Sequence, residues 1–324
     1  MKTYTNLVFK GGGVKGVAYA GAIQQLDSMG ILTGIKRVAG TSAGAITATL
    51  LAMGYSPAEI EDIVMNKMDF ESFMDKSWLP GNLTRVIKHF GWYKGDAFKK
   101  WLGEKIKVKT GSERTTFNDL KMLTNEKKEN FRDLYVVATN LDRQYPEVFS
   151  VEENVNTPIV DAVRMSMGIP LFFKSVAWNG NVMVDGGMGY NYPIDLFDHK
   201  KYVAETKNFE TRELKGSKVD VNSETLGLWL DTKAGIDNLR NRKPRPPEKI
   251  NNLKDFASLL VNYLMEMANM AHLEDYDWNR SVLIDSLDVK ATDFDSVKAR
   301  AKDLVESGKK GVIDYFKWLN SVRQ

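Results

Sequence analysis

The stretch that most constrains this chain is Gly40-Thr41-Ser42-Ala43-Gly44, in which a small nucleophile stands between two glycines. Residues 35–39 before it have the pattern of a short strand, and residues 45–53 after it have the pattern of a buried helix. A glycine-flanked serine at a strand-to-helix turn makes a sharp, strained bend that exposes the hydroxyl at the end of a sheet. The pattern G-x-S-x-G is only moderately specific by itself, so its meaning depends on the rest of the chain.

A second glycine-rich turn lies near the N-terminus. Residues 4–9 predict a strand that leads directly into Gly11-Gly12-Gly13-Val14-Lys15-Gly16, and residues 17–23 predict a helix. Such a loop offers unpaired backbone N–H groups at a helix N-terminus, where an anion binds well. Two anions fit: a dinucleotide pyrophosphate, or the oxyanion of a tetrahedral intermediate. The dinucleotide site also requires an acidic residue at the end of the second strand, and here that strand leads to Ser42 instead.

The third element is a carboxylate at the end of a predicted strand. Residues 182–184 are followed by Asp185-Gly186-Gly187, and the glycines allow another backbone or a substrate to come close. A serine needs a base to become a nucleophile, and an anion-binding loop supplies the electrostatic stabilisation that dominates acyl transfer. Alone, Asp185-Gly186-Gly187 is equally typical of a plain turn after a strand. Combined with Ser42 and the glycine loop, it is predicted to supply the base.

These three elements, in this order, resemble the motifs of the patatin-like phospholipases, serine lipid hydrolases that use a Ser-Asp dyad in place of a triad. The resemblance implies a lipid acyl hydrolase of the phospholipase A or lysophospholipase type, which forms an acyl-enzyme and needs no metal or cofactor. It assigns the nucleophile to Ser42 and the proton acceptor to Asp185. It assigns the oxyanion hole to Gly11, Gly12, Gly13, Val14, Lys15 and Gly16, the nucleophile elbow to Gly40, Thr41, Ala43 and Gly44, and the base motif to Gly186 and Gly187.

The resemblance extends beyond the three motifs. Residues 166–173 before the aspartate and Asn191-Tyr192-Pro193 after it also look like the family, so the likeness covers most of residues 5–200. Residues 284–287 and 292–294 look, more weakly, like its C-terminal part. Many family members carry arginine where Lys15 stands, and the positive charge is kept.

Strands alternate with helical stretches up to about residue 200, which predicts a three-layer α/β/α sandwich with a mostly parallel central sheet, as in patatins. Residues 134–140 form the clearest interior strand, and Ser56-Pro57-Ala58-Glu59 has the capping pattern of a helix start. Residues 225–230 predict a late strand that would complete the sheet. We therefore expect one domain over residues 1–324, with the motifs in 1–200 and the late strand plus a helical cover in 201–324.

Composition argues against nucleic acid as a partner and favours the cytoplasm as the compartment. With 45 Lys+Arg against 42 Asp+Glu, the formal charge of +3 is too small a bias to indicate nucleic-acid binding. The 324 residues contain no cysteine, no recognised metal-ligand spacing and no visible N-terminal signal peptide, so we expect a cytoplasmic protein without disulfides or metal. No segment has the roughly 18 to 20 continuous apolar residues that span a bilayer, so contact with lipid is expected to be peripheral.

Two other mechanisms remain open at this stage. The chain order Ser42, Asp185 and then His199 or His272 fits an α/β-hydrolase triad, so a Ser-His-Asp esterase is an alternative. His199 lies in a charged run typical of a solvated helix end, and His89 precedes Asp185. A dinucleotide-binding or signalling module without hydrolysis is the alternative from another class.

Several apolar or basic segments are candidates for lipid contact. Residues 78–81 and 89–93 are aromatic and contain helix breakers, and either fits a lid or a small core cluster. The Met-rich helical run 256–270 is typical of a core or a subunit interface, and less so of contact with acyl chains. The basic loop 240–245 suits anionic headgroups, a nucleotide-like regulator or plain solvation. The expected substrate is a phospholipid or other acyl lipid at a membrane surface, and a homo-oligomer and a small-molecule or protein activator are left open.

Overall fold

The computed structural model describes residues 3–69, 72–74, 90–126, 130–206, 208–214, 217–241, 244, 247–291 and 293–322. Several sequence features named above lie outside these residues: the aromatic segment 78–81, His89, Thr292, and the side chains Arg242, Lys243 and Arg245 of the basic loop. Among the described residues, no helix has the length and apolar character needed to cross a membrane.

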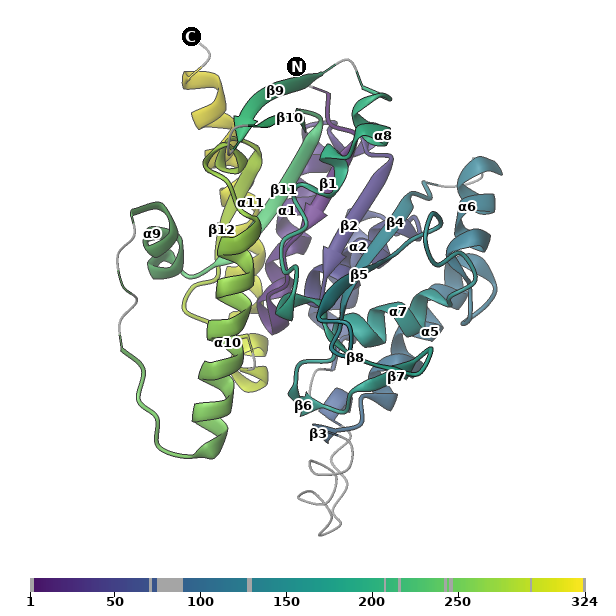
Figure 1. Ribbon diagram of the computed structural model, residues 1–324, viewed down its shortest axis with the longest axis vertical. Coiled ribbons are helices and arrows are strands. Elements are labelled where there is room, and N and C mark those ends of the chain that lie inside the picture. The colour runs from purple at the N-terminus through teal and green to yellow at the C-terminus, as the bar shows by residue number, and fades with distance from the viewer. Residues whose placement is uncertain are drawn as a thin grey trace.

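An eight-stranded sheet forms the centre of the molecule, in the order β12-β11-β1-β2-β4-β8-β7, with β5 paired to β4 (Figure 1). Its strands are β1 Asn6–Phe9, β2 Arg37–Thr41, β4 Asp133–Asn140, β5 Tyr145–Phe149, β7 Val176–Trp178, β8 Asn181–Asp185, β11 Thr225–Asp231 and β12 Ser281–Asp285. The pairings from β12 across to β4 are parallel, whereas β5, β8 and β7 join antiparallel. The prediction of a mostly parallel sheet is confirmed.

Two smaller sheets and a set of helices complete the fold. The small sheets pair β3 Gly91–Tyr93 with β6 Leu171–Phe173, and β9 Phe209–Leu214 with β10 Ser217–Asn222. The α-helices are α1 Ala18–Ser28, α2 Ala43–Ala52, α3 Pro57–Asp62, α5 Asp96–Thr110, α6 Phe117–Glu126, α7 Ile159–Ser166, α8 Lys200–Val203, α9 Lys233–Asn241, α10 Leu253–His272 and α11 Phe294–Ser321. Short helical turns include η1 Gly13–Val17, η5 Gly186–Met188, η6 Leu196–Asp198 and η7 Asp275–Arg280.

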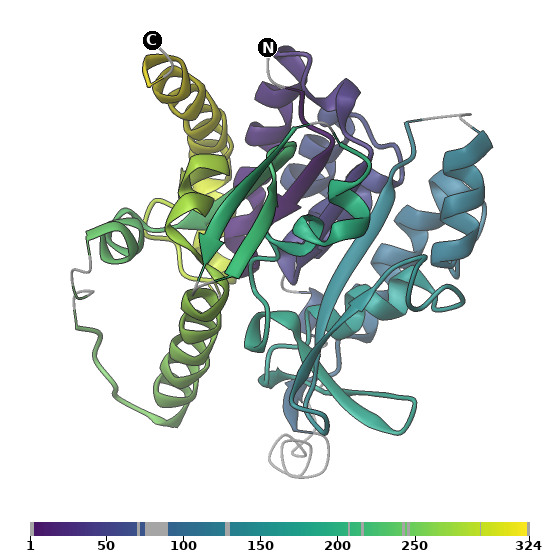
Figure 2. The same ribbon diagram turned by 45° about the horizontal axis from the view of Figure 1, so that its top comes forward.

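Alternate residues of the strands enter two different cores, as the period of two in a strand requires. Leu7 and Phe9 of β1 belong to the larger core, with side chains from α1, α2, α5, α7 and α11. Val8 of the same strand belongs to a smaller core on the other face, which includes Phe197 and Tyr202 from η6 and α8. The sheet is therefore covered on both faces, with α8 and α10 on one side and α1 and α2 on the other (Figures 1 and 2).

Local signals set several element boundaries. Ser56 caps α3 as expected, because its hydroxyl accepts from the Glu59 N–H while the Glu59 carboxylate accepts from the Ser56 N–H. The two motif-bearing strands start slightly later than the sequence suggests, at Asn6 and Arg37. The late strand β11 pairs with both β1 and β12, so the C-terminal third contributes strands to the same sheet. This supports our proposal of one domain over residues 1–324.

Candidate active site

Ser42 occupies the turn between β2 and α2 in a strained conformation. Its φ of 53° and ψ of −123° lie outside the regions that ordinary side chains prefer, at an expected cost of about 1–3 kcal/mol. The Ser42 N–H donates to the Ser166 hydroxyl at 2.8 Å, which fixes the turn to the end of α7. The hydroxyl is thus held at the carboxyl ends of the parallel strands, where α/β sheets bind ligands.

Two glycines allow this bend because neighbouring backbone comes very close. A Cβ added at Gly40 would lie 2.4 Å from the Gly44 backbone, and one added at Gly44 would lie 2.4 Å from the carbonyl oxygen of Phe9. Thr41 also anchors the turn, since its hydroxyl donates to the Tyr190 carbonyl at 2.9 Å. The glycines of the G-x-S-x-G pattern are therefore required by packing.

The glycine-rich loop after β1 lies directly against this turn, because a Cβ at Gly16 would be 3.1 Å from the Cβ of Ala43. Two of its amides are already engaged: the Gly11 N–H donates to the Asn191 carbonyl at 3.0 Å, and the Val14 N–H donates to the Ala291 carbonyl at 2.9 Å.

The amides of Gly12 and Gly13 find no acceptor among the described residues. Gly13 has a φ of 59°, a conformation that glycine adopts at little cost. Of the expected oxyanion-hole residues, Gly12 and Gly13 have N–H groups without an acceptor in the described part of the chain, whereas the N–H groups of Gly11 and Val14 are engaged.

Asp185 ends β8 and is fully buried. The pairings Thr41 with Val137 and Ala138 with Asp185 bring it next to the serine turn, across β4. Its Oδ1 accepts from the Gly187 N–H at 2.7 Å, whereas Oδ2 makes no hydrogen bond of ordinary geometry.

The electrostatics of Asp185 favour a proton acceptor that works near neutral pH. Burial raises the pKa of this carboxyl to about 7, although hydrogen bonds from the Gly187 N–H and the Ser42 side chain oppose the rise. A Cβ at Gly186 would lie 2.2 Å from the Val137 carbonyl oxygen, so this motif also depends on close backbone packing. A general base is most effective when its pKa lies near the working pH.

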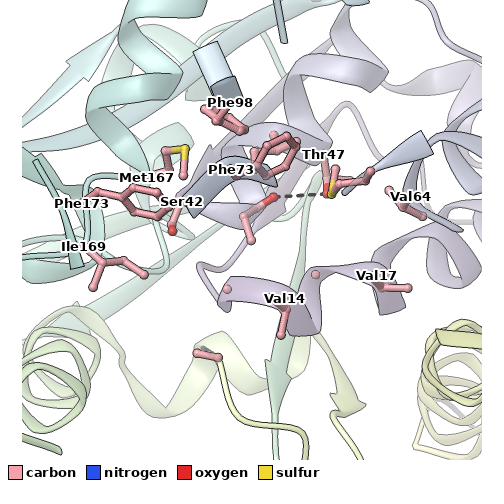
Figure 3. A pocket seen from close by; sticks show the side chains of 16 residues that line it. Val14, Val17, Ser42, Thr47, Val64, Phe73, Phe98, Met167, Ile169 and Phe173 are labelled. Carbon is pink, nitrogen blue, oxygen red and sulfur yellow. Dashed lines mark hydrogen bonds between the residues drawn. The ribbon is translucent and has the colours of Figure 1, made fainter. Parts of the chain in front are cut away.

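A pocket opens at Ser42, and its lining is almost entirely apolar (Figure 3). Among the described residues that line it, only Ser42 and Thr47 contribute polar side chains; the others are Gly13, Val14, Gly16, Val17, Ala43, Ile46, Val64, Met68, Phe73, Phe98, Met167, Ile169, Phe173 and Ala291. An apolar pocket with a few convergent polar groups is the usual form of a small-molecule site. This one suits a hydrocarbon chain attached to a reactive group at Ser42.

Among the described residues, neither His199 nor His272 makes a hydrogen bond to Ser42 or Asp185. His199 is exposed, and its Nδ1 accepts from the Lys201 N–H at the start of α8. Within the same helix, Tyr202 lies under the guanidinium of Arg37, the first residue of β2, so α8 is at the opposite edge of the sheet from Ser42. His272 packs its ring against Tyr190, with centroids 4.6 Å apart.

Some residues of the site carry no recognisable signal in the sequence. In the sequence, Ser166 is one residue of the family-like stretch 166–173, and its role in holding the Ser42 amide appears only in the fold. The carbonyl of Ala291 and the pocket residues Val64, Phe73 and Phe98 come from distant segments. Their apolar character is indistinguishable from that of any core residue in the sequence.

Comparisons with known proteins agree with the geometry. Two relatives are "Uncharacterized protein YqhO" of Bacillus subtilis, 29% identical over 95% of this chain and 96% of the relative, and "Probable lipid hydrolase 463L" of Invertebrate iridescent virus 6, 30% identical over 60% of this chain and 63% of the relative. VipD from Legionella pneumophila has a similar fold, with a TM-score of 0.56 at 18% identity over 99% of this chain and 67% of that one. The family model "Patatin-like phospholipase" matches residues 7–198, so the chain belongs to the patatin-like phospholipase family.

Proposed function

We propose that this protein is a lipid acyl hydrolase that cleaves carboxyl esters of phospholipids or other acyl lipids through an acyl-enzyme on Ser42. Membership of the patatin-like phospholipase family and a relative named as a probable lipid hydrolase support the reaction class. One structural observation carries the residue assignment. The strained Ser42 and Gly13 both line an apolar pocket, and the Ser42 side chain interacts with the buried Asp185 carboxyl, whose pKa is about 7.

Acylation begins when the Ser42 oxygen attacks the carbonyl carbon of the ester and its proton passes to the Asp185 carboxylate. The carbonyl oxygen becomes an oxyanion, which the N–H groups of Gly12 and Gly13 stabilise by donating hydrogen bonds. The intermediate then collapses, the bond between carbon and the alcohol oxygen breaks, and Asp185 returns its proton to the departing alcohol. The products are a free alcohol and an acyl ester on Ser42.

Deacylation repeats these steps with water. Asp185 takes a proton from a water molecule while the oxygen of that water attacks the acyl carbon. When the second intermediate collapses, the bond to the Ser42 oxygen breaks and Asp185 gives the proton back to Ser42. A fatty acid leaves, and the dyad is restored.

The proposal rests on an ionised Asp185, so the pH dependence follows from its pKa of about 7. The rate should rise as pH increases through about 7 and then level off, since only the carboxylate accepts a proton. The apolar pocket accounts for the acyl part of the substrate, because burying a hydrocarbon chain gains about 0.8 kcal/mol for each CH₂ group.

A fluorophosphonate probe tests the proposal directly. The wild-type chain should be labelled at Ser42 and should release fatty acid from phospholipid vesicles, whereas Ser42→Ala should do neither. Labelling should increase with pH across the neutral range, because the probe reacts with the activated hydroxyl. An unlabelled wild-type protein that binds NAD or NADP at micromolar concentration in calorimetry would instead favour the dinucleotide-binding alternative.

A further inference from the structure

The end of α7 contacts the backbone of both members of the proposed dyad. The Ser42 N–H donates to the hydroxyl of Ser166, the last residue of this helix, at 2.8 Å. The Asp185 N–H donates to the carbonyl of Gly168, two residues further on, at 2.9 Å. Ser42, Ser166 and Asp185 are all buried, so each amide depends on its protein acceptor. One segment of three residues therefore holds the main chain of both Ser42 and Asp185.

Ser42 depends on such support because its backbone conformation is unfavourable. A residue with a side chain is strained at a φ of 53° and a ψ of −123°, and it stays there only where several contacts hold it. The Ser166 hydroxyl supplies one of these contacts, and no other described group accepts the Ser42 N–H. Without the hydroxyl, this amide would be buried and unpaired, which favours relaxation of Ser42 towards an ordinary conformation.

The contact with Ser166 controls the direction of the Ser42 side chain. Strand β4 already places the two dyad residues close together, because Thr41 and Asp185 pair with consecutive residues of that strand. Proton transfer requires more than this, since the Ser42 oxygen must lie within about 2.6–3.2 Å of the carboxylate. A change in φ at Ser42 would move its oxygen away from Asp185 even if the strands stayed in place. The contact at the Ser42 amide therefore bears directly on reactivity.

Other contacts at this turn hold the chain on either side of Ser42. The Thr41 hydroxyl donates to the Tyr190 carbonyl at 2.9 Å, and α2 begins directly after Ser42, at Ala43. These contacts do not involve the Ser166 hydroxyl, so they persist when it is removed. We therefore expect the loss of that hydroxyl to disturb Ser42 locally and to leave the fold intact.

We propose that Ser166 is a positioning residue whose hydroxyl holds the Ser42 amide and so keeps the Ser42 oxygen aligned with Asp185. The inference rests on the proposed ester hydrolysis through Ser42. Met167 and Ile169 of the same segment line the pocket beside Ser42, whereas Ser166 does not (Figure 3). Ser166 therefore acts through Ser42 and not on the substrate, so its loss should lower kcat and leave KM little changed.

Initial rates on a soluble short-chain ester test this role. Ser166→Ala removes the acceptor without adding atoms, so we expect kcat to fall roughly 10- to 100-fold while KM stays within about threefold of wild type. Ser166→Thr keeps a hydroxyl and should recover most of that loss. Ser150→Ala is the matched control, because Ser150 is 1% exposed and its hydroxyl also accepts a backbone N–H, that of Glu152 at 3.2 Å. It should leave kcat unchanged.

Two further measurements make the test independent of any one variant. Hydrogen exchange of the Ser42 amide, followed by NMR, should be faster in Ser166→Ala than in wild type or Ser150→Ala. If the extra methyl group of threonine prevents folding, Ser166→Cys keeps a weak acceptor, and its kcat should fall between those of Ser166→Ala and wild type.

The outcomes separate this inference from the proposed function. A wild-type kcat in Ser166→Ala overturns the positioning role, as does unchanged exchange of the Ser42 amide. A lack of recovery in whichever of the threonine and cysteine variants folds overturns it too, because packing would then explain the loss. A wild-type protein that neither hydrolyses the ester nor reacts with a fluorophosphonate overturns the proposed function instead.

Discussion

Buried carboxylates lie at both edges of the sheet, and the two edges differ in the partners that offset their negative charge. At the edge where the parallel strands end, Asp185 is fully buried and makes no ion pair with any described cation. At the edge where they begin, Asp198 and Asp277 hold Arg280 between them, at 2.6 Å and 2.7 Å. Arg280 directly precedes β12, and Asp198 also accepts from the Asn222 N–H ahead of β11.

The contrast favours a structural role for the Arg280 cluster and a catalytic role for Asp185. Burial alone would lower the pKa of Arg280, but the hydrogen bonds and charges of Asp198 and Asp277 outweigh it and raise that pKa. Arg280 offsets part of the negative charge of the two carboxylates, although burial still raises the pKa of Asp198 and of Asp277. Asp185 has only a backbone N–H and a serine hydroxyl to offset burial, so its pKa rises to about 7 and its proton is exchangeable near neutral pH. An uncompensated buried carboxyl costs stability, which is the expected mark of a functional site.

The largest expected effect is the loss of catalysis when either member of the dyad is changed. Ser42→Ala and Asp185→Asn should each lower ester hydrolysis on the order of 10⁴-fold or more, and the double variant should be scarcely worse, because groups that act as a unit are not additive. Initial rates on one ester, with circular dichroism as the folding control, measure this. An Asp185→Asn protein with near wild-type turnover at neutral pH would remove Asp185 from the mechanism.

Stability should respond to the two carboxylate groups with opposite signs. Arg280→Met should destabilise the fold by about 3–5 kcal/mol, because it leaves two buried carboxylates without their cation. Asp185→Asn should stabilise it at pH 8, by up to about 4 kcal/mol for a shift from 3.8 to about 7. Denaturant unfolding of both variants against wild type gives the two free energies.

The gain from Asp185→Asn should also depend on pH in a defined direction. A folded-state pKa above the unfolded value means that the wild type keeps the contribution of this group below about pH 4 and loses it as pH rises through about 7. The difference between variant and wild type should therefore be greatest above pH 7 and shrink towards pH 4. A difference that is the same at pH 4 and pH 8 would mean that Asp185 is not the buried, uncompensated group described here.

The glycine loop provides a smaller effect. Gly13→Ala should lower turnover by roughly 10²-fold or more with little change in apparent substrate affinity, because the loop amides stabilise charge that forms only during the reaction. The added Cβ would stand 2.0 Å from the Ala291 carbonyl oxygen, so the loop must shift.

Gly30→Ala is the matched control, since Gly30 has a similar positive φ of 71° and nothing within 4 Å of an added Cβ. It should lower the melting temperature slightly and leave turnover unchanged. If the two alanine variants lost activity equally, backbone strain alone would explain the result for Gly13.

The sequence predicts the frame of the site well because its motifs are local. The strand-to-helix turn at Ser42, the loop at Gly13 and the strand end at Asp185 each depend on neighbours within a few residues, and each is found where expected. The mostly parallel sheet follows from the alternation of strands and helices. The roles of these residues in catalysis remain predictions.

What the sequence could not predict depends on contacts between distant segments. Nothing local indicates that the Val14 N–H is taken by Ala291, which leaves Gly12 and Gly13 as the available amides. For the Met-rich helix, the sequence favours a core or a subunit interface, and the fold shows that part of its apolar face stays outside the core of this chain. Periodicity reveals that a helix has an apolar face, but only packing decides what that face meets.

The smallest expected effect distinguishes the dyad from a triad. His199→Ala and His272→Ala should each keep ester hydrolysis within about tenfold of wild type, whereas removing a general base costs on the order of 10²–10⁴-fold. His199 caps α8 at the structural edge of the sheet, and His272 packs on Tyr190, so their loss should be felt as lost capping and packing. Rates measured beside melting temperatures separate these effects. A well-folded histidine variant with the activity loss of Asp185→Asn would identify a third catalytic group. The Ser42-Asp185 dyad would then not account for catalysis by itself.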